Sequence, residues 1–156
     1  MLKGIIFDFD GVIAESVQIK TDAFAELYAQ YGRDIENKVV EHHEANGGIS
    51  RFKKIKFYHE SFLNKAITKE EITDLANQFS QLVVEKVINA TYVPGVLEYI
   101  QKSFMHYKLF ISTGTPTKEI KQILDGRKIA HFFTDVFGSP DKKTVHINNI
   151  EINYGL

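Results

Sequence analysis

At 156 residues, the chain has the length of one domain, or of a small core that carries an insertion. Its 19 Lys and Arg residues nearly balance its 20 Asp and Glu residues, which excludes a strong field that would recruit nucleic acid or an anionic membrane. No cysteine is present, which excludes disulfides and thiolate chemistry. The apolar run before Asp8 is too short for a signal peptide and no run has transmembrane length, so we expect a cytoplasmic protein without a membrane partner.

The first predicted element is a strand over Ile5–Phe7, because a short run of apolar, β-favouring residues is typical of a strand buried on both faces. Asp8 and Asp10 follow this strand, and Gly11 suits a sharp turn. In an open parallel sheet, ligands bind outside the carboxyl ends of the strands. Two acidic residues beside a core at such a place predict a cation site. The alternative is a pair of ordinary turn aspartates.

A helical block follows. The spacing of apolar residues predicts three helices before residue 64, over residues 16–31, 36–44 and 49–63. Thr68 and Glu71 then form a capping box at the start of a fourth helix, which carries an apolar stripe as far as Val87. Residues 16–90 are therefore predicted to be an all-helical insertion.

From Pro94 onward the pattern alternates between helices and short strands. The predicted elements are a helix over 94–104, a strand over 108–111, a helix from Pro116 to 124, a short helical piece to 132, a strand over 135–137 and a helix from about 142. This order predicts an α/β fold with a parallel sheet, in which residues 1–15 and 91–156 form the core.

Hydroxyl side chains and a glycine end the second predicted strand, in the segment Ser112-Thr113-Gly114-Thr115-Pro116. A hydroxyl group, a glycine and a helix N-terminus together are typical of an anion site. The alternative is an N-capping turn with nothing bound.

The segment Asp8-Phe9-Asp10-Gly11-Val12 after an N-terminal strand resembles the first motif of the haloacid dehalogenase-like (HAD) hydrolases. Within that superfamily, the chain resembles the subgroup of phosphoglycolate phosphatases and β-phosphoglucomutases, which have a Rossmann-like core and a helical cap. The resemblance implies that Asp8 is a nucleophile that takes up a phosphoryl group and that Asp10 is the general acid/base. It also implies one Mg²⁺ ion, held by a carboxylate oxygen of Asp8 and the backbone carbonyl of Asp10.

Two further motifs are implied by the same resemblance. Thr113 aligns with the residue that binds the substrate phosphate, with the Gly114 N–H beside it, and Ser112 takes this place if the register slips by one. Lys143 aligns with the lysine that bridges nucleophile and phosphate, where positive charge must offset the repulsion between two anions. The alternative is a solvated pair of lysines at a helix start.

In the helical block, the segment around Gly48, Arg51 and Lys54 resembles the substrate-specificity segment of the family's cap. A glycine pair leading into a helix, with two cations one turn apart, would offer a second anion contact. A solvated basic helix face is the alternative. Without aromatic stacking residues or overall basicity, these cations do not predict nucleic-acid binding.

The resemblance implies Mg²⁺-dependent hydrolysis of a small phosphorylated metabolite through an aspartyl-phosphate, with a sugar-phosphate mutase as the alternative. The family's fourth motif, acidic residues after a further strand, does not occur before Leu156, so the chain resembles a member truncated before that motif. We therefore expect weak Mg²⁺ binding, low activity and an exposed apolar edge on the first strand, through which the chain could form a homo-oligomer. A catalytically silent, oligomerising remnant is a second hypothesis.

Overall fold

The computed structural model describes residues 2–156, and it divides the chain into two compact units. The first, called the α/β unit here, contains the residues up to Ser16 together with Val87–Leu156. The second, called the helical unit, is Val17–Lys86. The spacing of apolar residues predicted the helical insertion at residues 16–90.

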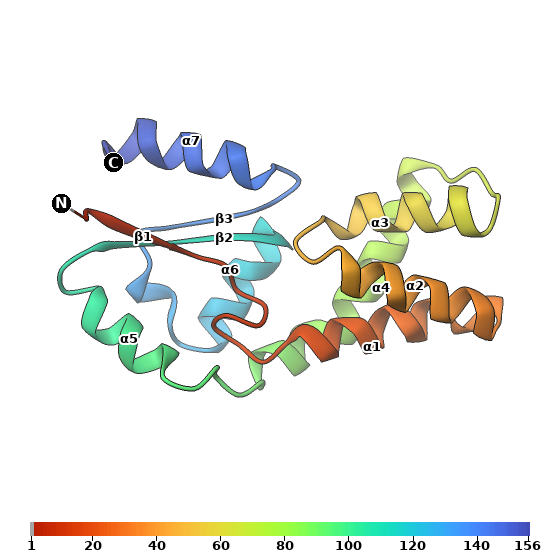
Figure 1. The fold of residues 1–156 in the computed structure, drawn as a ribbon, viewed down its shortest axis with the longest axis horizontal. Helices are drawn as coiled ribbons and strands as arrows, with labels where there is room; N and C mark the ends of the chain where they lie inside the picture. The colour runs from red at the N-terminus through yellow and green to blue at the C-terminus, as the bar shows by residue number, and fades with distance from the viewer. Residues whose placement is uncertain (1) are drawn as a thin grey trace. The chain divides into compact units, whose positions relative to one another are not determined.

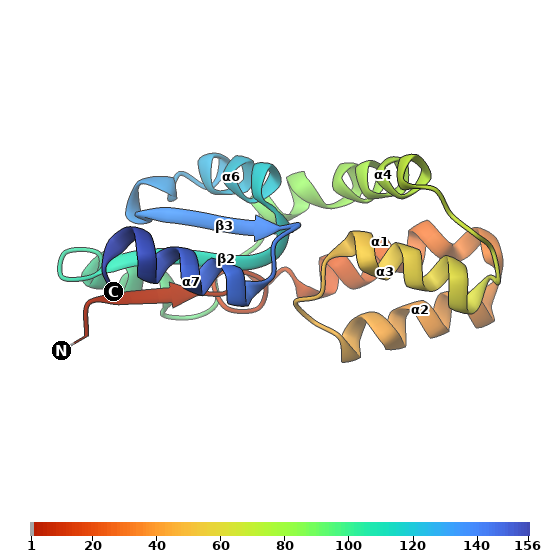
Figure 2. The ribbon, with the colours of Figure 1, turned by 90° about the horizontal axis from the view of Figure 1, so that it is seen from above.

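The α/β unit contains a parallel three-stranded sheet in the order β1-β2-β3. Its strands are β1 (Gly4–Phe7), β2 (Lys108–Pro116) and β3 (Asp135–Ser139). Its helices are α5 (Val96–Ser103), α6 (Thr117–Gly126), the 3₁₀ turn η3 (Ala130–Phe132) and α7 (Lys143–Tyr154). Helix α7 lies on one face of the sheet, and α5 and α6 lie on the other (Figures 1 and 2). The predicted fold class, a parallel α/β core with an inserted helical block, is confirmed.

Side chains alternate between the two faces along β1 and β2. Phe110 faces α7, since its ring centroid lies 5.0 Å from that of Tyr154. Phe7 faces α5, since its ring centroid lies 6.2 Å from that of Tyr99. Even-numbered residues of these strands therefore face α7, and odd-numbered residues face α5 and α6.

The structure corrects two predictions about the strands. β1 is not buried on both faces: Phe7 is buried, but Ile6 is 41% exposed, because β1 is an outer strand of the described sheet. β2 supplies the apolar centre of the sheet and continues past its predicted end at Ile111 to Pro116. Pro116 has an extended conformation with ψ of 140°, so it precedes α6 instead of forming its first turn.

The end of β3 packs against the connection between β2 and α6 at Gly138. A methyl group on Gly138 would lie 2.2 Å from the carbonyl oxygen of Thr115 and 2.6 Å from the backbone nitrogen of Thr117. The Gly138 N–H also donates a hydrogen bond of 3.0 Å to Thr117 Oγ1. Only glycine fits this approach of backbone to backbone.

Arg127 caps the segment that enters the α/β unit after the insertion. Its Nη1 donates hydrogen bonds to the carbonyl oxygens of Val87 (2.9 Å), Ile88 (3.1 Å) and Ala90 (2.7 Å). Its guanidinium carbon lies 4.2 Å from the ring centroid of Tyr92. Because the last carbonyls of a helix lack partners within the helix, one side chain here satisfies a group of polar atoms that would otherwise need water.

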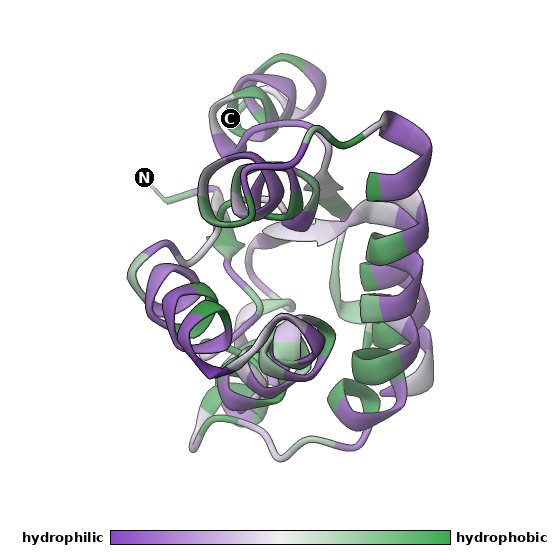
Figure 3. Ribbon diagram, turned by 90° about the vertical axis from the view of Figure 1, so that its right-hand side faces the viewer, coloured by the Kyte–Doolittle hydropathy of each residue, from purple (hydrophilic) through white to green (hydrophobic). Residues whose placement is uncertain are grey.

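The helical unit packs around a cluster of aromatic side chains, in which Phe24 contacts both Tyr58 and Phe79. Its elements are α1 (Val17–Tyr28), the 3₁₀ turn η1 (Ala29–Tyr31), α2 (Arg33–Ala45), α3 (Arg51–Phe57), the π-helical turn η2 (Tyr58–Phe62) and α4 (Lys69–Ile88). Hydrophobic residues gather on one side of the long helix α4 (Figure 3).

The predicted capping box before α4 is confirmed. The Thr68 N–H donates to a carboxylate oxygen of Glu71 at 2.7 Å, and the Glu71 N–H donates to Thr68 Oγ1 at 3.2 Å. Across residues 2–156, the helices are too short or too polar for any of them to span a lipid bilayer.

Candidate active site

The central feature of the site is an ion pair between residues that the sequence places 135 positions apart. Lys143 is the first residue of α7, and its Nζ lies 2.6 Å from Asp8 Oδ2. Asp8 follows β1, on the side of the sheet that faces α7, so strand alternation directs its carboxylate toward this helix. The other oxygen, Oδ1, accepts a hydrogen bond of 2.8 Å from the Phe9 N–H. Both side chains keep about 40% of their surface exposed, at 40% for Lys143 and 39% for Asp8, so a ligand can reach them.

Asp10 is held by the turn that follows β1. Gly11 has φ of 73°, in the left-handed region that favours glycine, and its N–H donates to the carbonyl oxygen of Ala14 at 2.8 Å. Ser16 Oγ donates to Asp10 Oδ1 at 2.6 Å. Phe9 is fully buried between the two aspartates, and it fixes this segment to the core. Ser16 was not predicted, because a serine before a helix is usually only a cap.

The residues present fit a Mg²⁺ ion. Mg²⁺ prefers hard oxygen ligands and is usually held by one or two carboxylates, several waters and the substrate phosphate. Asp8 offers a carboxylate, and Asp10 offers both a carboxylate and a backbone carbonyl. No cluster of three or more His, Cys, Asp and Glu residues that could hold a metal occurs in the described part of the chain. Water and substrate would therefore supply much of the coordination.

Thr113 and Gly114 lie at the same edge of the sheet as Asp8. The register supports this placement, because Phe7, the last residue of β1, pairs with Ile111, two residues before Thr113. Thr113 is buried, and its Oγ1 accepts a hydrogen bond of 3.2 Å from the Thr115 N–H. Gly114 is partly exposed. The structure thus brings Thr113, Gly114, Asp8 and Lys143 to one edge.

The side chain of Ser112 has a different environment. Its Oγ lies 2.8 Å from Nδ1 of His146 on α7, and both residues are buried. Strand alternation turns Ser112 toward α7, and phosphate binding by Ser112 in place of Thr113 stays a prediction. His146 was missed by the sequence analysis. Its one signal is a spacing of three residues from Lys143, which places both on the first turn of the same helix.

Gly48, Arg51 and Lys54 all belong to the helical unit. Arg51 is buried, with its guanidinium carbon 4.6 Å from the ring centroid of Phe79 and its Nη1 donating to Ser80 Oγ at 2.7 Å. Lys54 is also buried, with Nζ 2.8 Å from His43 Nδ1. A solvated basic face is therefore wrong for these two cations. Gly48 has φ of 84° in an exposed turn. Contact of the three residues with a substrate stays a prediction.

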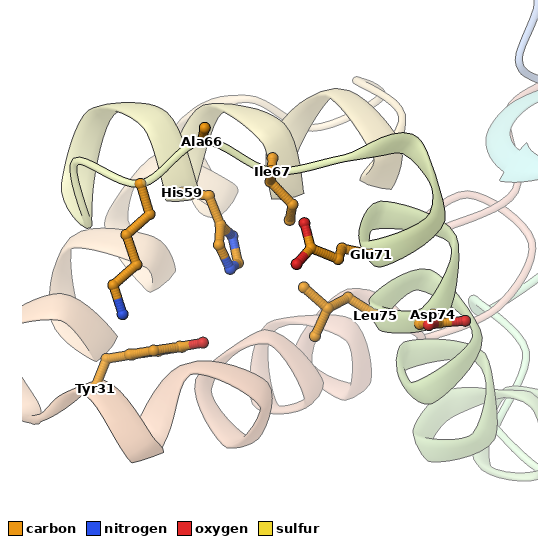
Figure 4. Close-up of a pocket in the computed structure, with 8 residues that line it drawn as sticks. Tyr31, His59, Ala66, Ile67, Glu71, Asp74 and Leu75 are labelled. Atoms are coloured by element: carbon orange, nitrogen blue, oxygen red, sulfur yellow. The ribbon is translucent and has the colours of Figure 1, made fainter.

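The helical unit also contains a cavity of about 320 Å³ (Figure 4). Tyr31, His59, Lys65 and Glu71 are among its lining residues, and Lys65 Nζ lies 5.6 Å from the ring centroid of Tyr31. None of the predicted site residues lines this cavity.

Solved structures share the fold of this chain. A predicted phosphoglycolate phosphatase from Haemophilus somnus is 21% identical, with a TM-score of 0.71 over 99% of this chain and 72% of its own. A β-phosphoglucomutase from Clostridium difficile is 24% identical, with a TM-score of 0.68 over 87% of this chain and 61% of its own. A HAD-hydrolase from Bacillus subtilis, solved with bound magnesium, is 16% identical, with a TM-score of 0.62 over 88% of this chain and 65% of its own. At these identities the likeness shows the fold alone.

Among curated protein sequences, none matches the chain significantly. The family model of the haloacid dehalogenase-like hydrolases matches residues 5–151. That range contains the ion pair, the turn after β1 and the hydroxyl-bearing end of β2. Because this match covers nearly the whole chain, the protein belongs to the haloacid dehalogenase-like hydrolases.

Proposed function

We propose that the protein hydrolyses small phosphomonoesters by transferring the phosphoryl group to Asp8. One observation carries this proposal: Lys143 Nζ lies 2.6 Å from Asp8 Oδ2 at the carboxyl edge of the sheet, beside the turn that holds Asp10. An anionic nucleophile and an anionic phosphate repel each other, and a fixed cation between them offsets this repulsion. Membership of a hydrolase family supports the same chemistry.

In the first step, a carboxylate oxygen of Asp8 attacks phosphorus while the bond from phosphorus to the leaving oxygen breaks. Asp10 donates its proton to that oxygen, so the product leaves as an alcohol. In the second step, Asp10 takes a proton from water, which attacks the aspartyl-phosphate and releases inorganic phosphate and free Asp8. Ser16 holds one oxygen of Asp10 during both transfers.

The anion is bound from two sides. Lys143 donates to one oxygen of the phosphoryl group that is transferred. The Thr113 hydroxyl and the Gly114 N–H donate to its remaining oxygens. Mg²⁺, when bound by the Asp8 carboxylate and the Asp10 carbonyl, supplies further charge neutralisation.

Asp8→Asn tests the proposal, because it keeps the shape of the side chain and removes the nucleophilic oxygen. We expect release of phosphate from p-nitrophenyl phosphate, with Mg²⁺ present, to fall by at least roughly 10³-fold. Asp125→Asn, at an exposed position of the same unit, is the matched control and should keep the wild-type rate.

Hydrolysis by Asp8→Asn at the wild-type rate would rule out covalent catalysis at Asp8. With sugar phosphates as substrates, accumulation of an isomerised sugar phosphate in place of free phosphate would assign the protein to mutase chemistry instead.

A further inference from the structure

The ring of His146 is hydrogen-bonded at both nitrogens inside the α/β unit. Nδ1 lies 2.8 Å from Ser112 Oγ, and Nε2 lies 3.1 Å from the carbonyl oxygen of Gly138. A carbonyl oxygen only accepts, so Nε2 carries the hydrogen and donates to Gly138. Burial lowers the pKa of His146 and favours the neutral ring, in which Nδ1 accepts from the Ser112 hydroxyl. This assignment makes His146 a neutral ring with both of its polar atoms used.

These two bonds join three elements that contribute to the candidate site. His146 lies on the first turn of α7, where its N–H donates to the Lys142 carbonyl oxygen at 3.1 Å. Lys143 lies on the same turn. Ser112 directly precedes Thr113 in β2, and Gly138 belongs to β3. The ring therefore connects the turn that carries the cation to the strand end that carries the hydroxyl.

The surroundings of the ring favour a fixed position. The side chain is 1% exposed, and its ring stacks on Phe137 with centroids 5.7 Å apart. Asp141 and Lys143 are the charged residues whose fields reach it, and they have opposite signs. A nonpolar side chain of similar size would fill this space but would leave Ser112 and Gly138 without their partner.

We propose that His146 is a positioning residue, which acts through Ser112 and Gly138 to hold Lys143 at the distance from Asp8 and Thr113 that phosphoryl transfer requires. The catalytic part of this inference rests on the proposed function. His146 itself touches neither Asp8 nor the phosphate in this arrangement. His146 acts on the position of the first turn of α7, which carries Lys143. Even a small displacement of a catalytic group can lower the reaction rate strongly.

The test compares His146→Phe, which fills the volume and forms neither bond, with the matched control His106→Phe at an exposed position of the same unit. With p-nitrophenyl phosphate, we expect kcat of His146→Phe to fall by roughly 10- to 100-fold while KM changes by less than about threefold. His106→Phe should keep the wild-type values. Loss of packing alone would lower stability without this split between kcat and KM.

A second measurement does not depend on turnover. Acetic anhydride acetylates lysines at rates that mass spectrometry can follow, and we expect the ion pair with Asp8, at 2.6 Å from Nζ, to shield Lys143 from the reagent. Normalised to the exposed Lys118, acetylation of Lys143 should accelerate several-fold in His146→Phe and stay unchanged in His106→Phe. If His146→Phe does not fold, Ser112→Ala removes one of the two bonds with little change in volume and should shift both readouts in the same direction.

A folded His146→Phe with kcat and Lys143 acetylation within twofold of the wild type overturns the inference. The same result for Ser112→Ala, where His146→Phe does not fold, also overturns it. A wild-type chain that hydrolyses no phosphomonoester refutes the proposed function instead, and the acetylation rates then still decide whether His146 positions Lys143.

Discussion

Replacing Lys143 by Met should separate the catalytic role of this lysine from its contribution to stability. Two unit charges 2.6 Å apart, the distance from Nζ to Asp8 Oδ2, attract each other by about 1.6 kcal/mol at the dielectric constant of water. Both side chains are about 40% exposed, so salt screening and the entropy of fixing them offset much of this attraction. We therefore expect Lys143→Met to lower the free energy of unfolding by less than about 1 kcal/mol.

The expected effect on catalysis is much larger. When a phosphate covers the pair, water leaves and the same ammonium group faces charge that moves onto the transferring oxygens. Loss of one such preorganised donor typically costs roughly 10²- to 10³-fold in kcat. Lys143→Arg should fall between the wild type and Lys143→Met, because it keeps the charge but presents it as a planar fork.

Lys142→Met is the matched control, because Lys142 is the exposed neighbour of Lys143 and the alternative interpretation treats both as a solvated pair. Urea denaturation and the rate of p-nitrophenyl phosphate hydrolysis are measured on all variants in the same buffer. Equal losses of activity in Lys142→Met and Lys143→Met would refute the assignment of Lys143. A loss of more than about 2 kcal/mol in stability for Lys143→Met would show that the ion pair is chiefly structural.

Three further predictions concern stability. Arg127→Met removes the donor shared by three carbonyl oxygens and should lower the free energy of unfolding in urea by about 2–4 kcal/mol. The control Arg33→Met, at a side chain that is 82% exposed, should lower it by less than about 0.5 kcal/mol. Equal losses in the two variants would contradict the capping role. Thr68→Ala breaks the capping box and should cost about 1 kcal/mol, while Thr68→Ser should cost far less, and no difference between the two would argue against the hydroxyl. Burial holds the pKa of His146 below its ordinary value, so the unfolded chain binds more protons and the free energy of unfolding should fall as the pH drops below about 6.5. His146→Phe should lose the part of this pH dependence that comes from His146. The same pH dependence in His146→Phe and the wild type would contradict this prediction.

The sequence predicted the parts of the site that depend on strand order. Asp8 and Lys143 follow different strands of a parallel sheet, and the carboxyl ends of such strands meet at one edge. That rule places both segments at one edge, the family resemblance singled out Lys143, and the two side chains lie 2.6 Å apart. The capping box at Thr68 was also predictable, because it depends on two residues at a fixed local spacing.

The features that the sequence analysis missed depend on which face each residue occupies. Ser112 and Thr113 are neighbours with similar side chains, and only the register of β2 shows that Ser112 faces His146. Arg51 and Lys54 look like surface cations in the sequence, but aromatic rings and hydrogen-bond partners make their burial favourable. Neither arrangement has a local sequence signal, because the partners come from distant segments.

Gly138 sets a spacing that no side chain could set. Thr113 lies near the end of β2 and Lys143 begins the helix that follows β3, and at Gly138 the backbone of β3 rests directly on the backbone after Thr115. A Cβ atom at Gly138 would collide with the backbone at Thr115 and Thr117, and it would therefore separate Thr113 from Lys143. The absence of a Cβ atom at Gly138 thus sets the width of the anion site.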